Sequence, residues 1–334
     1  MRYVTIKDIA EQLGISTSTV SRALADDRYV SEETRRKVLA TAAELGYHRN
    51  ENAAHLRLRK SRIIGIVVPE MVTPFFQKVI VSVQERLNQE GFKLIITQSH
   101  ESYEAERYNL RLLEDYRVEG IIMSICDIEK NRNEYLQLEE KGIPLVFFDR
   151  VPPHIDAPKV MIDDYRKAFF LMEHLIGTGR RKIIHLAGPT RIPNAIERKR
   201  AYVDVLNKFK LPVDPACIIE AGSAIEEGEQ SIVDFLKQKI DFDAVFCFTD
   251  TLAFGAMKAL AANGFRIPED IAVTGFSGTI LSTIVNPSLT TVVQPVEEMG
   301  KIAAELMMER ITAPGNTDFK HISLNAEIKI GKSS

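Results

Sequence analysis

The sequence predicts an all-helical N-terminal domain followed by an α/β body of two lobes with mostly parallel sheets. Three short segments with helical spacing come before Gly46. From Ile63 onward, apolar runs of strand length alternate with amphipathic helical stretches, which is typical of parallel sheets covered by helices on both faces. The 334 residues exceed one ordinary hydrophobic core, and the number of alternating units exceeds one usual sheet.

Composition excludes several classes of protein. Hydrophobic residues make up 45% and charged residues 27% of the chain, as in globular proteins. No apolar run reaches the roughly 18 residues of a membrane span, and the N-terminus lacks the apolar core of a signal peptide. Cys126, Cys217 and Cys247 form no CxxC pair. We therefore expect no disulfide framework, no metal site, no cofactor and a cytoplasmic location.

Charge is divided unevenly along the chain. Residues 1–62 contain 12 Lys and Arg against 8 Asp and Glu, a balance of +4, whereas the remainder carries −7. A basic head on an acidic body fits a polyanionic partner for the head alone, but a solvated charged surface gives the same pattern.

The first helix is predicted to follow Thr5. Thr5 suits the N-cap, Asp8 lies in the first turn, where a negative charge favours the helix dipole, and Gly14 suits a left-handed end. The residues of its apolar stripe recur at helical spacing: Ile6, Ile9, Ala10 and Leu13.

Two more helices follow in the head. The second lies in "ISTSTVSRALA", begins with four hydroxyl residues and places Val20, Ala23 and Leu24 on one face. The third starts after the cap Ser31 and stops at Gly46. Its apolar face is predicted from the same periodicity: Val38, Leu39, Ala42 and Leu45.

A helix, a tight turn, a second helix and a supporting third helix are the layout of a helix-turn-helix DNA reader. With the second helix in the major groove, Thr17, Ser18 and Arg22 face base edges, because arginine is the best bidentate partner of guanine. Other short hydroxyl groups would hold phosphates: Thr5, Ser16, Thr19 and Ser21. The alternative is a plain helical hairpin in which the Ser and Thr residues are caps.

The joint between head and body, "YHRNENAAHLRLRKSR", is rich in Arg and Lys. It is too polar for a stable isolated helix and suits a segment that folds on DNA. Leu56 stands among basic residues, which fits either an apolar wedge for the minor groove or an incidental leucine in a charged linker.

The body is predicted from alternating runs. Strand-like runs include "IIGIVV", "KLIITQS", "GIIMSI", "PLVFFD", "KIIHLAG", "AVFCFTD" and "IAVTGF". Helical stretches between them include "FFQKVIVSVQERLNQEG", "YRKAFFLMEHLIGTG" and "TLAFGAMKALAANG". Ligands of such sheets bind beyond the carboxyl ends of the strands.

Those strand ends carry polar and aromatic residues. "PLVFFD" ends in Asp149 and Arg150, "AVFCFTD" ends in Asp250, and Phe75 and Phe76 open the helix after "IIGIVV". Carboxylates, an arginine and aromatic faces suit a polyhydroxylated ligand. Each Asp also has the alternative role of a helix cap.

Enzyme motifs are missing from the sequence. It contains no GxGxxG after a strand, no GxxxxGK[ST], no HExxH and no GxSxG, and its seven histidines do not pair with Cys or Asp at ligand spacing. We therefore predict that the protein is not an enzyme.

The head motifs "VTIKDIA", "ISTSTVSR", "VSEETRRKV" and "LGY" match, in order and spacing, the head of the lactose/galactose repressor (LacI/GalR) family of bacterial transcription regulators, which this chain closely resembles. The body resembles the same family through "GIIM", "IPLVFFDR", "LAGP", "TDTLAFGAMKAL", "IPEDIAVTGF" and "PSLTTVVQP". The resemblance implies a body with the fold of periplasmic sugar-binding proteins.

Domains and site residues follow from the resemblance. It implies a helix-turn-helix domain at 1–49, a hinge helix and linker at 50–62, and an effector and dimerisation domain at 63–334. The N-lobe would hold about 63–162 and 293–320, and the C-lobe about 163–292 and 321–334.

Hinge contacts to DNA fall on Asn50, Ala53, Leu56 and Arg57, with Leu56 as the wedge. Effector contacts fall on Phe75, Phe76, Asp149, Arg150, Arg198, Asp250, Ser277 and Gln294.

The chain departs from the family pattern at several positions. Arg49 stands where the family commonly has Pro. Ala54 stands where Arg or Gln is common, and Ala201 stands where Gly is common. Ser277 replaces an Asp that commonly grips the effector, which fits an acidic or phosphorylated sugar or a protein corepressor.

The function predicted is a sequence-specific, dimeric transcription regulator, a repressor of carbohydrate-use genes controlled by a sugar or sugar derivative. Its partners would be double-stranded DNA with a near-palindromic operator, the effector and a second copy of the chain, with no membrane. The alternatives are an activator or a regulator with a protein corepressor, and, less favoured, a pure sugar-binding protein.

Overall fold

The computed structural model describes residues 4–24, 29–47 and 61–334. These residues fall into two compact units, Met1–Ser61 and Arg62–Ser334, here called the head and the body. In the described part of the chain no helix is long and apolar enough to cross a membrane.

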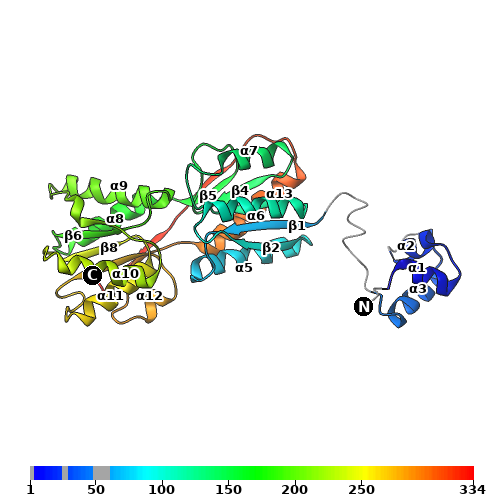
Figure 1. Ribbon diagram of the computed structural model, residues 1–334, viewed down its shortest axis with the longest axis horizontal. Coiled ribbons are helices and arrows are strands. Elements are labelled where there is room, and N and C mark those ends of the chain that lie inside the picture. Colours follow the sequence, from blue (N-terminus) through cyan, green and yellow to red (C-terminus); the bar gives the residue numbers. More distant parts are fainter. Residues whose placement is uncertain (1–3, 25–28, 48–60) are drawn as a thin grey trace. The chain divides into compact units, whose positions relative to one another are not determined.

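The head is a three-helix domain (blue in Figure 1), made of α1 (Ile6–Leu13), α2 (Thr17–Leu24) and α3 (Glu32–Glu44). The Asp8 carboxylate accepts hydrogen bonds from the Thr5 backbone amide and hydroxyl, which starts α1, and Gly14 ends it at φ 61°. The helices pack on a small apolar cluster. Leu39 was expected in this cluster, but it is 51% exposed.

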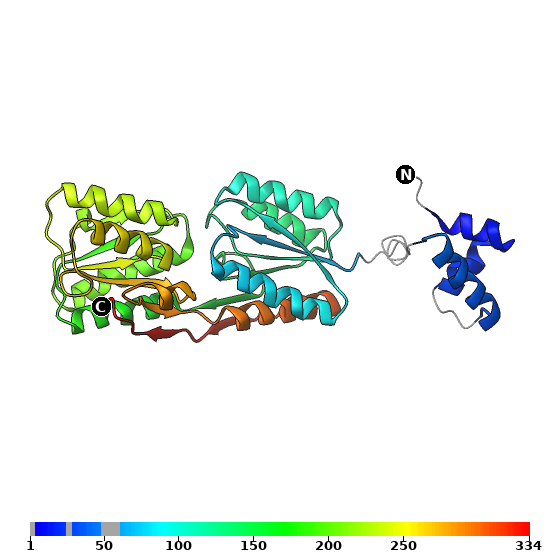
Figure 2. The same ribbon diagram turned by 90° about the horizontal axis from the view of Figure 1, so that it is seen from below.

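The N-lobe of the body is a six-stranded sheet in the order β11-β5-β4-β3-β1-β2, with every pairing parallel. Helices α5 and α13 pack together over one face, and α6 and α7 cover the other (Figures 1 and 2). Its elements are β1 (Ile63–Val68), α5 (Pro74–Gln89), β2 (Lys93–Gln98), α6 (Tyr103–Asp115), β3 (Gly120–Met123), α7 (Arg132–Glu140), β4 (Leu145–Phe148), β5 (Lys159–Ile162), α13 (Val296–Thr312) and β11 (His321–Leu324).

The C-lobe is a second six-stranded sheet, in the order β12-β10-β9-β8-β6-β7, with only β12 antiparallel. Helices α8 and α9 cover one face, and α10 and α11 the other. Its elements are α8 (Asp164–Gly177), β6 (Ile183–Ala187), α9 (Pro193–Lys208), the short helix η1 (Pro215–Cys217), β7 (Ile218–Glu220), α10 (Ile225–Lys237), β8 (Ala244–Cys247), α11 (Asp250–Ala262), β9 (Ala272–Ser277), α12 (Leu281–Ile284), β10 (Thr290–Val293) and β12 (Glu327–Lys329).

The chain passes between the lobes three times. The first two crossings lie between β5 and α8 and between β10 and α13. The third was expected near residue 321, with 321–334 in the C-lobe. That placement is wrong for 321–324, because β11 pairs with β5 in the N-lobe sheet, from His321 opposite Lys159 to Leu324 opposite Ile162. The chain therefore crosses between Leu324 and Glu327.

Burial on both faces explains why the central strands are almost wholly apolar. Strands β3, β4, β6 and β8 are buried at every position, as expected when helices cover both sides of a parallel sheet. Strands β4 and β8 end at the cleft between the lobes, so that residues directly after them become neighbours there.

Candidate functional sites

The start of α2 presents an exposed hydroxyl surface. Ser16, Thr17, Ser18 and Arg22 are exposed, while Thr19 and Ser21 are half-buried. The opposite face of the helix buries Val20 and fills the head's core. The helix thus has one face free for a partner and one fixed in the fold.

Ser16 also caps α2. Its Oγ accepts a hydrogen bond from the backbone amide of Thr19 at 3.1 Å and lies 2.7 Å from the Ser18 hydroxyl and 2.8 Å from the Thr19 hydroxyl. The capping alternative therefore holds for Ser16, as it does for Thr5 on α1. It does not account for Thr17 or Ser18, which lie inside the helix. The predicted hinge contacts Asn50, Ala53, Leu56 and Arg57 lie outside the described residues, as do Arg49 and Ala54.

The body brings all the predicted effector residues into one cleft between the lobes. The N-lobe supplies residues from the first turn of α5 and from directly after β4, and the C-lobe supplies residues from α9, α11 and β9. Gln294 follows β10 at the crossing between the lobes. The eight residues line one cavity of about 60 Å³: Phe75, Phe76, Asp149, Arg150, Arg198, Asp250, Ser277 and Gln294.

Arg198 of α9 is already paired on the C-lobe side. Its Nε and Nη2 donate to Oδ1 of Asp164 at 2.8 and 2.6 Å, and its Nη1 donates to the Phe248 carbonyl oxygen at 2.6 Å. The guanidinium also lies 3.5 Å from the ring centre of Phe276, a cation–π contact. Burial raises the pKa of Asp164, and the charge of Arg198 opposes that rise. Arg198 therefore holds a rigid position with most of its donors occupied.

Arg150 is paired on the N-lobe side. Its Nη1 donates to both carboxylate oxygens of Glu101, at 2.9 and 2.8 Å, and its guanidinium lies over the ring of Phe76. Glu101 and His100 both have left-handed backbones, with φ of 57° and 52°. Non-glycine residues rarely adopt this conformation, so the loop is held in a strained form that places the carboxylate against the arginine.

Asp149 connects the two lobes. Its Oδ1 accepts a hydrogen bond from the Asn194 side-chain amide of α9 at 3.1 Å. A second bond across the cleft runs from the Ile128 backbone amide to the Arg191 carbonyl oxygen, at 2.9 Å. Asp149 is buried, which raises its pKa, while Arg150 and Arg198 oppose that rise. Its backbone is left-handed and no helix follows it, so it is not a helix cap.

Asp250 acts inside the C-lobe. Its Oδ1 accepts from the Thr291 hydroxyl at 2.5 Å, and its Oδ2 accepts from the Thr279 backbone amide at 2.9 Å. Burial raises its pKa to about 6 against these hydrogen bonds. The cap of α11 is Thr249, so the capping alternative fails for Asp250 as well. Its carboxylate fixes the loop after β9 on the floor of the cleft.

Sequence reasoning missed four polar residues of the site. Asp164, Glu101 and Asn194 hold three of the four predicted charged residues, all except Asp250. The Glu70 carboxylate accepts from the backbone amides of Val72 and Thr73. "MIDD" directly after a strand was a signal for Asp164, by the same strand-end rule that found Asp149. Glu101 and Asn194 are recognisable only from the folded contacts.

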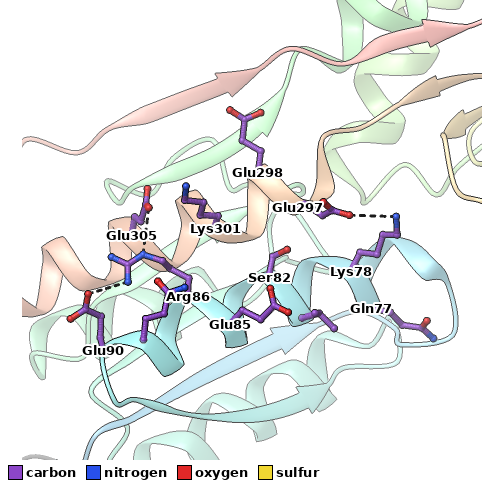
Figure 3. Close-up of a pocket in the computed structure, with 12 residues that line it drawn as sticks. Gln77, Lys78, Ser82, Glu85, Arg86, Glu90, Glu297, Glu298, Lys301 and Glu305 are labelled. Atoms are coloured by element: carbon purple, nitrogen blue, oxygen red, sulfur yellow. Dashed lines mark hydrogen bonds and ion pairs between the residues drawn. The ribbon is translucent and has the colours of Figure 1, made fainter.

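A larger hollow lies outside the cleft, between α5 and α13 on the N-lobe surface (Figure 3). It measures about 1160 Å³ and contains no predicted site residue. Several of its charged side chains pair with one another: Arg86 with Glu90 and Glu305, and Lys78 with Glu297. This is an open, solvated groove. Within the described residues no cluster of three or more His, Cys, Asp and Glu is arranged to hold a metal ion.

The head and the cleft together define a class of protein, the helix-turn-helix transcription regulator with a two-lobed ligand-binding body. Residues 5–50 match the family described as bacterial regulatory proteins, lacI family, and residues 61–329 match periplasmic binding proteins and sugar binding domain of LacI family. The chain belongs to the LacI family. This is a family of DNA-binding transcriptional repressors and not of enzymes.

Individual relatives match over nearly the full chain. The HTH-type transcriptional repressor PurR of Vibrio atlanticus (strain LGP32) is 34% identical, over 92% of each chain. The ribose operon repressor of Haemophilus influenzae (strain ATCC 51907 / DSM 11121 / KW20 / Rd) is 32% identical, over 96% of this chain and 95% of the relative. Among solved structures, the lac repressor dimer bound to operator and the anti-inducer ONPF is 25% identical, with a TM-score of 0.85 over 99% of both chains.

Proposed function

We propose that the protein represses genes of carbohydrate use, binding a near-palindromic operator as a homodimer and changing its operator affinity when a sugar or sugar derivative occupies the cleft. Its place of action would be the cytoplasm, where that DNA is. The observation that carries the effector half of this proposal is the cleft itself, in which buried carboxylates and aromatic rings from both lobes meet.

The DNA half rests on the surface of α2. Thr17, Ser18 and Arg22 are exposed on the side opposite the head's core, which suits contacts with base edges. Thr5, Ser16, Thr19 and Ser21 are proposed to contact phosphates. Because phosphate contacts release counterions, operator affinity should fall steeply with salt. An affinity that is independent of salt would contradict this arrangement.

The segment 50–62 is proposed as the hinge between the DNA-binding domain at 1–49 and the effector domain from 63 onward. Asn50, Ala53 and Arg57 would contact DNA, and Leu56 would wedge the minor groove. Leu56→Ala should then weaken operator binding and bending while leaving the melting of the body unchanged. Unchanged bending would contradict the wedge role.

A neutral sugar suits the cleft better than an acidic one. The absence of the usual Asp at Ser277 fits an acidic or phosphorylated sugar, but Arg150 and Arg198 are both already paired with carboxylates. An anionic ligand would have to break one of these buried pairs, which is costly. A neutral ring keeps both pairs and offers hydroxyls to Asp149 and to the amide of Gln294. The name of the ribose operon repressor is in line with this class of ligand.

The proposed mechanism is a change in lobe orientation. The Asp149–Asn194 and Ile128–Arg191 hydrogen bonds join the lobes where a ligand would enter. A ligand that binds one lobe arrangement more tightly shifts the population toward it, and one with equal affinity for both shifts nothing. The chain crosses between the lobes three times, so the lobes can turn without separating.

The test is the effect of Asp149→Asn on ligand response. This variant keeps the shape of the side chain but removes the charge that faces the cleft. We expect operator binding to persist and the sugar response to fall at least tenfold. Asp241→Asn, at an exposed position on the C-lobe, is the matched control and should respond like the wild type. A full response in Asp149→Asn would place the effector elsewhere.

A further inference from the structure

A second cavity adjoins the cleft beside the connection between β10 and α13. It measures about 410 Å³, against about 60 Å³ for the cleft cavity. Four residues line both spaces and mark where they meet: Phe75, Ser277, Thr279 and Gln294. Lys78, Val296 and Glu297 line the new space but not the cleft cavity. We call it the crossover cavity. It is the larger space available to a ligand that enters the cleft.

Small backbone features keep the passage between the two spaces open. Ser277 has φ of 147° and Gly278 has φ of 67°, so the chain turns sharply away at the end of β9. A Cβ at Gly278 would lie 2.4 Å from the Cα of Val293. The side chain at the junction is the short hydroxymethyl group of Ser277. A larger side chain at Ser277 would narrow this passage.

Two buried polar atoms at the junction have no partner in the described structure. They are Oε1 of Gln294, a residue only 5% exposed, and Oγ1 of Thr279. A buried polar atom left unpaired destabilises the fold. Gln294 and Thr279 line the cleft cavity and the crossover cavity. A ligand that crosses the junction can therefore form hydrogen bonds with these two unpaired atoms.

The charges around the crossover cavity select a neutral group. Helix α5 begins here with no acidic residue in its first turn and no side-chain cap from Thr73. The Glu70 carboxylate accepts from the Val72 and Thr73 amides, which lie before the helix, so the amide end of the first turn still favours acceptors. On the other side stand the Gln294 carbonyl oxygen and Glu297 in the first turn of α13, which favour donors. A carboxylate suits only the first side and an ammonium group only the second. A hydroxyl both donates and accepts, and so suits both.

The outer side of the crossover cavity is bordered by a weak contact. Lys78 and Glu297 form an ion pair at 3.6 Å, at the boundary with the open groove between α5 and α13 (Figure 3). Both side chains are more than half exposed, and such pairs contribute little to stability. The crossover cavity therefore has a loose outer wall and a polar inner end.

We propose that the crossover cavity is a second ligand subsite, which takes a neutral, hydroxyl-bearing second unit of the effector while the first unit contacts the cleft. The inference rests on the proposed sugar response and deepens it. It names the effector class as a neutral glycoside or disaccharide, held across the junction at Ser277 and Gln294.

Calorimetry on the full chain tests this subsite. The probes are D-ribose, D-glucose and D-galactose, with cellobiose, maltose and lactose as two-unit probes. We expect at least one disaccharide to bind ten times more tightly than its own monosaccharides. Val296→Phe, which fills the crossover cavity, should remove that difference and leave monosaccharide affinity within twofold. Val81→Phe, at a half-exposed position of α5 outside the cavity, is the size-matched control.

The outcomes separate the subsite from the proposed function. Equal affinity for one-unit and two-unit probes, or a preference that survives Val296→Phe, overturns the subsite and leaves the sugar response standing. Absence of binding by every probe overturns both. If Val296→Phe lowers the melting temperature of the body, the milder Val296→Leu replaces it and should reduce the preference in part.

Discussion

The exposed hydroxyl surface at the start of α2 and the cleft between the lobes differ in how their polar groups are held. On α2 the polar groups are exposed, and the hydrogen bonds of Ser16 reach no further than three residues along the chain. In the cleft the charged groups are buried and are held by partners far along the chain, as for Arg198 with Asp164, 34 residues away, and Arg150 with Glu101, 49 residues away. The difference teaches that DNA contacts can change with little cost to folding, whereas cleft residues support both binding and stability.

Removal of a cleft partner should have the largest effect. Asp164→Ala leaves the Arg198 charge buried without its carboxylate, which should cost the body about 3–5 kcal/mol of unfolding free energy. The measurement is denaturant unfolding of the full chain followed by a signal from the body. The matched control is Asp163→Ala, which removes only an N-cap hydrogen bond to Arg166 and should cost about 1 kcal/mol. Equal losses of unfolding free energy in Asp164→Ala and Asp163→Ala would contradict the claim that buried cleft partners support the stability of the body.

Removal of a residue proposed to contact DNA bases should affect operator binding and not the stability of the fold. Arg22→Ala should cost about 1–3 kcal/mol of operator affinity, since a bidentate base contact is worth that much, with no change in unfolding. Affinity for a selected duplex at fixed salt is the measurement. Lys37→Ala on α3, where Lys37 pairs with Glu33 on the surface, serves as the control and should bind nearly as well as wild type. A lower free energy of unfolding for Arg22→Ala would contradict the claim that this exposed residue contributes to DNA binding and not to folding.

The contrast also explains what the sequence made predictable. Asp149, Arg150 and Asp250 were predicted because parallel strands deliver their carboxyl ends to one edge, so position after a strand is enough to bring Asp149 and Asp250 together. Arg198 and Gln294 were identified only from the family resemblance. The head was found from caps and periodicity. Both rules are local, and both need only the residue's place in its own element.

Features that depend on distant contacts were not predictable. Glu101 reaches Arg150 only because its loop adopts two left-handed residues, which the sequence does not signal. Strand β11 was assigned to the wrong lobe because a run of four residues with mixed burial carries no information on which sheet it joins. Leu39 fits the apolar periodicity of α3 and is still exposed, since none of the head's described elements covers it.

The pH dependence of the body should come from the cleft and not from α2. Burial raises the pKa of Asp250 to about 6, above the unfolded value of about 3.9. The folded state then binds the proton more tightly, so this group's contribution to stability falls as pH rises from about 4 to 6 and is constant above that. Each unit of the rise corresponds to about 1.4 kcal/mol. Asp250→Asn should flatten the curve of unfolding free energy against pH; an unchanged slope would contradict this origin.

The smallest predicted effect is on the cap of α2. Ser16→Ala should cost the head about 1 kcal/mol of unfolding free energy, because the Thr19 amide loses its acceptor. Ser18→Ala, at an equally exposed hydroxyl without a backbone partner among the described contacts, should cost less than half of that. Thermal unfolding of the head reports both. Equal costs would mean that Ser16 serves DNA contact only.

In the proposed mechanism, a neutral sugar in the cleft changes the affinity of the protein for its operator DNA. The most direct measurement is selection of bound duplexes from random DNA at fixed salt, followed by titration of the selected duplex with and without each neutral sugar probe. We expect a near-palindromic duplex whose affinity for the protein changes with at least one sugar in the wild type and does not change in Asp149→Asn. A duplex whose affinity ignores every sugar, or responds equally in both proteins, would contradict the claim.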